Sequence, residues 1–287
     1  MKVAIQGGNA SFHDIATRFF FKTENFTIDC NDTFREVCEK LDKGEVDYAL
    51  MAIENSIAGY ILPNFSLIQD YGLNIVGEYK LRIKQNLMVL PGQDITQITE
   101  IKSHYMALLQ CKEYLNEYPH ISIKEYHDTA DAAKDIKENQ LKGVAAIAGE
   151  LAAERYGLEI LAPSIETIKL NYTRFFVLSK KQKHYHPRAE LNKSTLSFEL
   201  PHQVGALAKA LEIIVGNNVN LSSIHSIPII GKPDQYTFYI DCVYDDYIKV
   251  LKCYENLSKL VVNPTILGEY KKFEIDYTGL EAYKIEK

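Results

Sequence analysis

The regular alternation of strand-like and helix-like segments most constrains the fold of this chain. The apolar run Lys2–Gln6 is followed by a Gly-Gly-Asn turn and a helical pattern over His13–Phe21. An amphipathic helix is expected over Thr33–Lys43, with Asp32 as its N-cap, and a buried strand over Tyr48–Ile53. Because strands that alternate with helices of this length usually pair in parallel, we expect an α/β fold with a mostly parallel sheet.

The same alternation continues to about residue 179. Further helices are expected over Tyr60–Tyr71, Tyr105–Tyr118, Ala130–Asn139 and Glu150–Tyr156. Further strands are expected over Ile75–Tyr79, Asn86–Leu90, Ile121–Tyr126, Gly143–Ala148, Ile160–Leu161 and Arg174–Ser179. The polar and basic segment Lys180–Pro187 that follows is interpreted as a linker.

A second, smaller domain is expected after this linker. Its predicted elements are the strand Thr195–Leu200, the helix Val204–Val215, the strands Val219–Ile230 and Gln235–Val243, the helix Asp246–Leu257 and the strand Leu267–Phe273. This β-α-β-β-α-β order is typical of a ferredoxin-like module. A length of 287 residues also favours two domains over one.

Composition and charge exclude several classes of protein. With 46% hydrophobic and 24% charged residues, the chain is neither collagenous nor disordered, and no apolar run reaches the length of a membrane span. A net charge of −6 argues against a nucleic-acid partner. The strand at the N-terminus leaves no room for a signal peptide, and the five cysteines include no C-x-x-C pair. We therefore expect a cytoplasmic α/β protein with reduced, buried thiols and no metal ligands.

Short polar residues stand where strands of the first half give way to the next segment. They are Ser11, Asn55 with Ser56, Ser103, and Asp128 with Thr129, each predicted to cap a helix. Helix starts at the carboxyl ends of parallel strands lie on one edge of the sheet, where their free N–H groups and dipoles attract anions. Such residues also cap helices without any binding role, so only their number on one edge favours a carboxylate site.

Two further groups of polar residues are candidates for chemistry. Ser103 and Gln110 are seven residues apart and would share one face of a helix, where Gln110 either lines a cleft or is an ordinary polar edge. Thr173 and Arg174 precede an apolar strand and suit a hydrogen-bond donor and a carboxylate clamp. The alternative is a strand-forming threonine beside a surface arginine.

Taken together, these segments resemble the prephenate dehydratase family. The resemblance rests on five motifs in family order: Glu54-Asn55-Ser56-Ile57-Ala58-Gly59, Ser103-His104 with Ala107 and Gln110-Cys111, Asp128-Thr129-Ala130 with Ala132-Ala133, Ala145 through Leu158, and Asn171-Tyr172-Thr173-Arg174-Phe175. The module after the linker resembles the regulatory ACT domain through Gly205-Ala206-Leu207 and the run from Tyr236 to Asp241.

The resemblance implies a catalytic domain over residues 1–182 with a two-lobed fold like that of type II periplasmic binding proteins. Lobe one would hold about 1–77 and 166–182, and lobe two about 78–165. A linker at 183–193, an ACT domain at 194–275 and a C-terminal tail at 276–287 would follow. The implied reaction is loss of water and carbon dioxide from prephenate, which gives phenylpyruvate for phenylalanine synthesis.

The resemblance also assigns roles to residues. Thr173 and Glu54 would be catalytic, and His13 is a second candidate for the partner of Thr173. Substrate would be bound by Ser11, Asn55, Ser56, Ser103, Gln110, Thr129, Arg174 and Phe175. L-Phenylalanine, as an allosteric effector, would bind at Gly205, Ala206, Leu207, Asn220, Leu221 and Ser226. No cofactor or metal is implied, and a homodimer or homotetramer is expected.

Two segments depart from the family pattern. The opening G-P-x-G-T-[FY]-S loop is replaced by residues 6–12, where Ala10 takes the place of the threonine unless Ser11 supplies that hydroxyl from a shifted register. In the ACT domain, the E-S-R-P segment reads His225-Ser226-Ile227-Pro228, so a Glu and an Arg are missing near the effector site.

Two alternatives remain open on the sequence. Arogenate dehydratase would act on a substrate that differs only by an amino group in place of the keto group. A non-catalytic metabolite sensor could use the same two-lobed fold with an ACT domain. The retained Thr173 favours an enzyme, because a sensor does not need a proton donor at that position.

Overall fold

The computed structural model describes residues 1–22, 24–181 and 185–275. The chain forms two compact units. Unit 1 consists mainly of Met1–Ile61 and Tyr79–Phe175, and unit 2 of Leu62–Glu78 and Phe176–Glu274. The predicted tail at 276–287 and positions 182–184 of the predicted linker lie outside the described residues.

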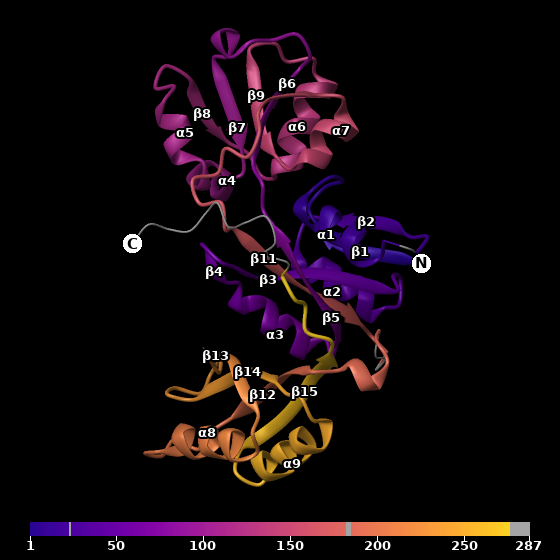
Figure 1. The fold of residues 1–287 in the computed structure, drawn as a ribbon, viewed down its shortest axis with the longest axis vertical. Coiled ribbons are helices and arrows are strands. Elements are labelled where there is room, and N and C mark those ends of the chain that lie inside the picture. Colours follow the sequence, from indigo (N-terminus) through magenta and orange to yellow (C-terminus); the bar gives the residue numbers. More distant parts are fainter. Residues whose placement is uncertain (23, 182–184, 276–287) are drawn as a thin grey trace. The chain divides into compact units, whose positions relative to one another are not determined.

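Residues 1–61 and 172–175 of unit 1, here called lobe one, contain a sheet with helices. Strand β1 (Lys2–Gln6) pairs in parallel with β2 (Thr27–Asn31) and β3 (Tyr48–Asn55), and β11 (Tyr172–Ser179) neighbours β3. Helices α1 (Phe12–Phe20) and α2 (Phe34–Asp42), which are drawn in indigo tones in Figure 1, pack on this sheet. Val3, Ala4 and Ile5 are fully buried, as expected of a strand covered on both faces.

The second half of unit 1, lobe two, is a five-stranded sheet in the order β10-β6-β9-β7-β8. Its strands are β6 (Asn86–Val89), β7 (Glu100–Ser103), β8 (Ser122–Glu125), β9 (Val144–Ala148) and β10 (Glu159–Ala162). Its helices are η1 (Ile95–Gln97), α4 (Tyr105–Gln110), α5 (Lys112–Asn116), α6 (Thr129–Glu138) and α7 (Glu150–Tyr156). Strands β7, β8 and β9 are parallel, and β10 has the same direction because both β9 and β10 are antiparallel to β6. The expectation of a mostly parallel sheet is therefore confirmed in this lobe, with β6 as the exception.

Two segments connect the lobes and are hydrogen-bonded to each other. One follows β5 (Asn74–Arg82), and the other precedes β11. The amide of Ile83 donates to the carbonyl of Asn171 at 2.7 Å, and the amide of Ile165 donates to the carbonyl of Gln85 at 2.7 Å. The side chains on these segments are therefore held at the boundary between the two lobes.

Unit 2 contains the expected ferredoxin-like module. Its elements are β12 (Lys193–Glu199), α8 (Ala206–Gly216), β13 (Asn220–Pro228), β14 (Tyr236–Val243), α9 (Tyr247–Ser258) and β15 (Val262–Tyr270), with the sheet order β13-β14-β12-β15 (Figure 1). The helix α3 (Leu62–Asp70), the turn η2 (Arg188–Glu190) and the first residues of β5 also belong to this unit. Lys193 of β12 and Glu78 of β5 form a buried ion pair at 2.9 Å.

The α/β class and the ferredoxin-like module are thus confirmed, with local corrections. The side chain that caps α2 is that of Thr33, not Asp32. The helix expected over Tyr105–Tyr118 is interrupted at Cys111 and forms α4 and α5. The last strand ends at Tyr270, three residues before the predicted end.

The cysteines and the helices can be compared with the expectations from composition. All five cysteines are free thiols and four are buried, but Cys30 is exposed, contrary to the prediction. None of the helices in the described part of the chain is long and apolar enough to cross a membrane.

Candidate active site

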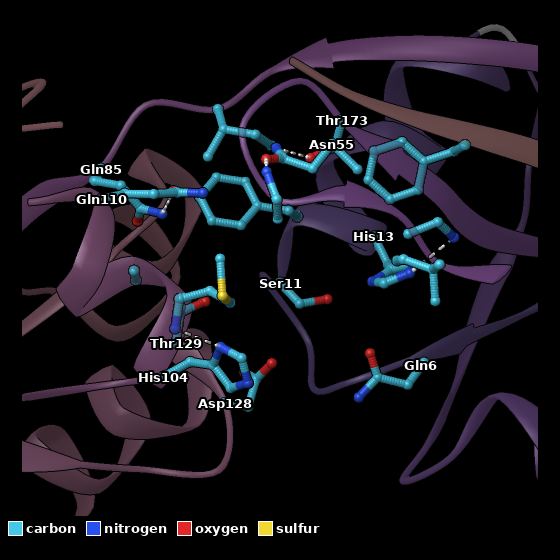
Figure 2. A pocket seen from close by; sticks show the side chains of 18 of the residues that line it. Gln6, Ser11, His13, Asn55, Gln85, His104, Gln110, Asp128, Thr129 and Thr173 are labelled. Carbon is cyan, nitrogen blue, oxygen red and sulfur yellow. Dashed lines mark hydrogen bonds between the residues drawn. The ribbon is translucent and has the colours of Figure 1, made fainter. Parts of the chain in front are cut away.

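A cavity of about 320 Å³ in unit 1 is lined by side chains from both lobes and from the connecting segments. Figure 2 shows ten of them around the cavity: Gln6, Ser11, His13, Asn55, Gln85, His104, Gln110, Asp128, Thr129 and Thr173. Most of these groups are neutral hydrogen-bond donors. Among the lining residues that the structure describes, there is no lysine or arginine.

Asn55 and Thr173 form the hydrogen-bonded centre of the lobe-one wall. Nδ2 of Asn55 donates to Oγ1 of Thr173 at 3.0 Å and to Oδ1 of Asn171 at 2.7 Å, while its Oδ1 accepts from the amides of Ile57 and Ala58 at 3.0 and 2.9 Å. The amide orientation is therefore fixed from both ends. Because Oγ1 of Thr173 accepts a hydrogen bond from Asn55, its own proton is left to donate toward a ligand.

Glu54 and Arg174, which are adjacent in sequence to this pair, do not line the cavity. Successive side chains of a strand point to opposite faces, so Asn55 and Thr173 face one side and their neighbours the other. Arg174 is buried, 4% exposed, and its Nη1 lies 3.9 Å from Oε2 of Glu54. The structure therefore does not bring the expected carboxylate clamp or the expected second catalytic group to the cavity.

Three helices begin at the cavity. Ser11 is the N-cap of α1, and its hydroxyl accepts from the amide of Asp14. Asp128 is the N-cap of α6 and accepts from the amides of Ala130 and Asp131, while burial raises the pKa of its carboxyl. His104 is the N-cap of α4. The predicted convergence of helix starts is confirmed for Ser11 and Asp128, and His104 provides a third start that was not predicted. Together these helix starts supply partial positive charge without a cationic side chain.

Two of the predicted caps are wrong. Ser103 is the last residue of β7, fully buried, and its hydroxyl donates to the carbonyl of Ile147 at 2.6 Å, so it shares no helix face with Gln110. Asn55 and Ser56 start no helix; β3 ends at Asn55 and a turn leads into β4 (Gly59–Tyr60). Ser56 accepts a hydrogen bond from the amide of Tyr172 at 2.9 Å and so holds the start of β11 in place.

His13 lies on the lobe-one wall between two aromatic rings. Its ring packs edge-on against Phe175 with centroids 5.0 Å apart and at 5.6 Å from Phe34. Nε2 accepts a hydrogen bond from the amide of Ala52 at 3.3 Å. Burial lowers the pKa of His13 to about 3, so the ring is neutral at ordinary pH.

Gln85 and Gln110 form the opposite edge of the cavity (Figure 2). Nε2 of Gln85 donates to Oε1 of Gln110 at 3.3 Å, and the carbonyl of Gln110 accepts from the amide of Thr167 at 2.8 Å. Gln85 is only 2% exposed. The pair therefore joins α4 to both connecting segments.

The structure brings together six of the ten predicted catalytic and substrate-binding residues. Those six are Ser11, Asn55, Gln110, Thr129, Thr173 and Phe175, whereas Glu54, Ser56, Ser103 and Arg174 do not line the cavity. Sequence reasoning missed Gln85 and His127, which also line it. Neither residue belongs to a motif. Gln85 reaches the cavity because its connecting segment pairs with residues 163–171.

The opening loop clarifies one of the departures in sequence. Ala10 has φ 68°, a left-handed conformation that favours glycine, while the Ser11 hydroxyl faces the cavity. This supports the shifted register, in which Ala10 replaces the glycine of the family pattern and Ser11 supplies the hydroxyl.

The predicted effector residues lie at two ends of the module in unit 2. Gly205 is the N-cap of α8 with φ 80°, and Ala206 and Leu207 begin that helix. Ser226 pairs with Phe238 of β14, and this pair lies at the same end of the sheet as Gly205. Asn220 and Leu221 pair with the last residues of β14, and these pair in turn with the first residues of β12 at the opposite end of the sheet. One copy of the module therefore does not bring all six residues together.

The fold and the cavity define a two-lobed α/β domain whose cavity is lined by neutral donors and helix starts, joined to a ferredoxin-like module of the ACT type. Among the described residues, no group of three or more His, Cys, Asp and Glu side chains is placed to hold a metal ion. Comparison with known proteins identifies the family. The sequence profile described as prephenate dehydratase matches residues 3–183, and the chain belongs to this family.

Several relatives are similar over almost the whole chain. Prephenate dehydratase of Lactococcus lactis subsp. lactis is 33% identical over 280 residues, which are 96% of this chain and 99% of the relative. A crystal structure of prephenate dehydratase from Arthrobacter aurescens in complex with L-Phe is 26% identical, with a TM-score of 0.85 over 95% of this chain and 90% of that one. A structure described as a novel type of quorum-quenching acylase is 29% identical, with a TM-score of 0.85 over 95% and 98% of the two chains.

Proposed function

We propose that this protein is a prephenate dehydratase that converts prephenate into phenylpyruvate, water and carbon dioxide. The observation that carries the proposal is Thr173, whose hydroxyl is held by Asn55 in a cavity made of neutral donors. The prephenate dianion takes up one proton, loses its ring hydroxyl as water and its ring carboxylate as carbon dioxide, and leaves the phenylpyruvate anion. Formation of the aromatic ring supplies the driving force, so the protein has to position the dianion and protonate the departing hydroxyl.

Thr173 would donate the hydrogen bond to the departing hydroxyl. Its Oγ1 accepts from Asn55, which orients the hydroxyl proton away from the amide, toward the cavity. A threonine hydroxyl is a weak acid, so it would pass on a proton rather than ionise. The neutral His13, with its pKa lowered to about 3, is a poor source for that proton at neutral pH, and Glu54 lies on the other face of β3.

The carboxylates would be held by hydrogen-bond donors rather than by ion pairs. The first turns of α1 and α6 begin at the cavity, and the N-terminal amides of a helix bind anions well. The hydroxyls of Ser11 and Thr129 and the amides of Gln85 and Gln110 add further donors. A dianion that is extracted from water into such a site loses hydration, which favours departure of the ring carboxylate as neutral carbon dioxide.

Turnover of prephenate by three proteins tests this assignment. The wild type, Thr173→Ser and Thr173→Ala should have the same thermal denaturation curve within a few degrees, because Thr173 is a small residue at the cavity wall. We expect Thr173→Ser to retain activity within about tenfold and Thr173→Ala to lose about 100-fold or more in kcat. Equal activity of all three would refute the role of Thr173.

We also propose that L-phenylalanine binds unit 2 and alters turnover. Gly205 supports this, because a Cβ built on it meets nothing within 4 Å and its backbone is open to a ligand carboxylate. His225, in the segment that departs from the family pattern, packs on Phe65 of α3 at 5.6 Å, and Tyr239 donates to Gln69 of the same helix at 2.8 Å. Helix α3 begins directly after Tyr60 and Ile61, which line the cavity.

Titration of activity with L-phenylalanine tests the regulatory proposal. A response that disappears in Tyr239→Phe, while activity without phenylalanine is kept, would support transmission through α3. A wild type whose activity is unchanged at millimolar phenylalanine would contradict it.

Residues 1–182 would then carry the reaction and residues 194–275 its regulation. Assembly as a homodimer or homotetramer is supported by the large apolar side chains that unit 2 exposes: Val204, Val215, Ile230, Ile248 and Leu251. The five free thiols support a reducing, cytoplasmic location. Light scattering of the purified protein would test the assembly, and a monomer at micromolar concentration would contradict it.

A further inference from the structure

Three side chains form a row along the lobe-one wall of the cavity. Thr173 and Phe175 are two residues apart on β11 and face the same side, so they are separated by about 6 to 7 Å along the strand. The ring of His13 follows, with its centroid 5.0 Å from that of Phe175. All three line the cavity, but Phe175 is only 1% exposed, so Thr173 and His13 are the members of this row that can offer hydrogen bonds to a ligand.

The hydrogen bond to Ala52 fixes the tautomer of His13. A backbone amide can only donate, so Nε2, which lies 3.3 Å from it, is the unprotonated nitrogen. The proton is then on Nδ1. In Figure 2 the bond to Ala52 leaves the ring on the side away from the cavity, so the remainder of the ring is turned toward the ligand space.

The substrate carries the two groups that leave on one ring. Prephenate carries its hydroxyl and its ring carboxylate at opposite positions of a six-membered ring. A substrate held by Thr173 at its hydroxyl extends its ring carboxylate away from Thr173, and His13 is a further donor on the same wall of the cavity. Resting on the proposed function, we infer that His13 binds the departing ring carboxylate through its Nδ1–H group and, as an uncharged donor, does so without restraining decarboxylation.

The neutral state of His13 matters because the carboxylate loses its negative charge during the reaction. The bond from the ring to the carboxylate carbon breaks, its electron pair enters the ring, and the hydroxyl leaves with one proton as water. Negative charge therefore disappears from the carboxylate during the step. A cation beside it would stabilise the bound substrate more than the transition state, and only differential stabilisation accelerates a reaction. Burial of His13 keeps its pKa low and the ring neutral.

Steady-state kinetics separates KM from kcat in four variants. His13→Leu removes the donor and should raise KM by about 10- to 100-fold, as for loss of a hydrogen bond to a charged group, with kcat within threefold. His13→Lys introduces a cation and should lower KM while kcat falls by about tenfold or more. Because a buried lysine can prevent folding, the conclusion does not depend on that variant alone.

His13→Asn and His13→Gln distinguish the ligand role from a structural one. Asn places its amide near Nδ1 and should keep KM within about fivefold of the wild type, although the Ala52 amide loses its acceptor. Gln reaches the position of Nε2, can accept from Ala52 and should behave like His13→Leu in KM. His120→Asn, an exposed histidine that does not line the cavity, is the matched control and should be unchanged.

Three results would overturn the inference. They are a KM within threefold of the wild type in a folded His13→Leu protein, a kcat loss of 100-fold with unchanged KM, and a Gln variant that outperforms Asn. Failure of the proposed function is a separate result, because the wild type would then form no phenylpyruvate at all.

Discussion

Replacing Asn55 with aspartate separates the two roles of this side chain. Oδ1 accepts from the amides of Ile57 and Ala58 and shapes the turn after β3, whereas Nδ2 donates to Thr173, Asn171 and the carbonyl of Tyr172. Aspartate keeps the two acceptor contacts and loses the three donor contacts, at 3.0, 2.7 and 3.3 Å. The aspartate oxygen that replaces Nδ2 would attract the Thr173 proton.

The expected magnitudes follow from these contacts. Three partly buried hydrogen bonds at about 0.5 to 1.5 kcal/mol each predict a loss of about 2 to 4 kcal/mol in the free energy of unfolding. The effect on catalysis should be of similar size, because the Thr173 hydroxyl would donate to Asp at position 55 instead of to the substrate. Misdirection of one catalytic group costs about 100-fold in kcat.

Urea denaturation and prephenate turnover measure the two effects on the same preparation. Asn55→Ala is the matched control, because it removes both sets of contacts and should lose more stability than the aspartate variant. An Asn55→Asp protein that is folded and has kcat within threefold of the wild type would refute the reasoning that Asn55 orients the Thr173 proton.

Three further predictions concern stability. Gly268→Ala places a Cβ 2.1 Å from the carbonyl oxygen of Ile75 and should cost about 2 to 4 kcal/mol in urea denaturation, whereas Gly216→Ala, with nothing within 4 Å, should not destabilise. Lys193→Met leaves the buried carboxylates of Glu78 and Asp241 without the ammonium that lies 2.9 and 3.6 Å from them. It should cost about 3 to 5 kcal/mol, of which only the part due to Glu78 is recovered when Glu78→Gln is added. His13 has a native pKa of about 3, below its unfolded value, so at mildly acidic pH the unfolded chain binds one proton more than the folded chain. The free energy of unfolding should therefore fall by up to about 1.4 kcal/mol per pH unit as the pH drops from 6 toward 4. His13→Gln should flatten this dependence in thermal melts. A wild-type stability that is constant over that pH range, a neutral Gly268→Ala or a harmless Lys193→Met would contradict the respective structural account.

The large elements of the fold follow from the sequence because hydrophobic periodicity reports on each element directly. The run Lys2–Gln6 and the amphipathic pattern near α2 need no tertiary information. The direction of each strand in lobe two cannot be predicted from hydrophobic periodicity. The antiparallel placement of β6 depends on how the chain enters the lobe from the connecting segments, and no local pattern encodes that.

The candidate site could be predicted from the sequence where a motif specifies both the residue and the direction in which its side chain points. The motifs that contain Asn55 and Thr173 predict that both belong to one site, and both line the same cavity. The prediction for Arg174 does not take into account the alternation of side chains along β11. Ser103 was misplaced because a shift of one residue in the helix start, to His104, turns a cap into a buried strand residue. Gln85 lies in the cavity through long-range pairing of two segments, which a single sequence does not reveal.

The most direct test of the central claim is product analysis with the purified wild-type protein. Prephenate supplied alone should yield phenylpyruvate and carbon dioxide in equal amounts, with kcat falling about 100-fold or more in Thr173→Ala. Folded protein that binds prephenate but releases neither product would contradict the account and would leave the cavity as a binding site without catalysis.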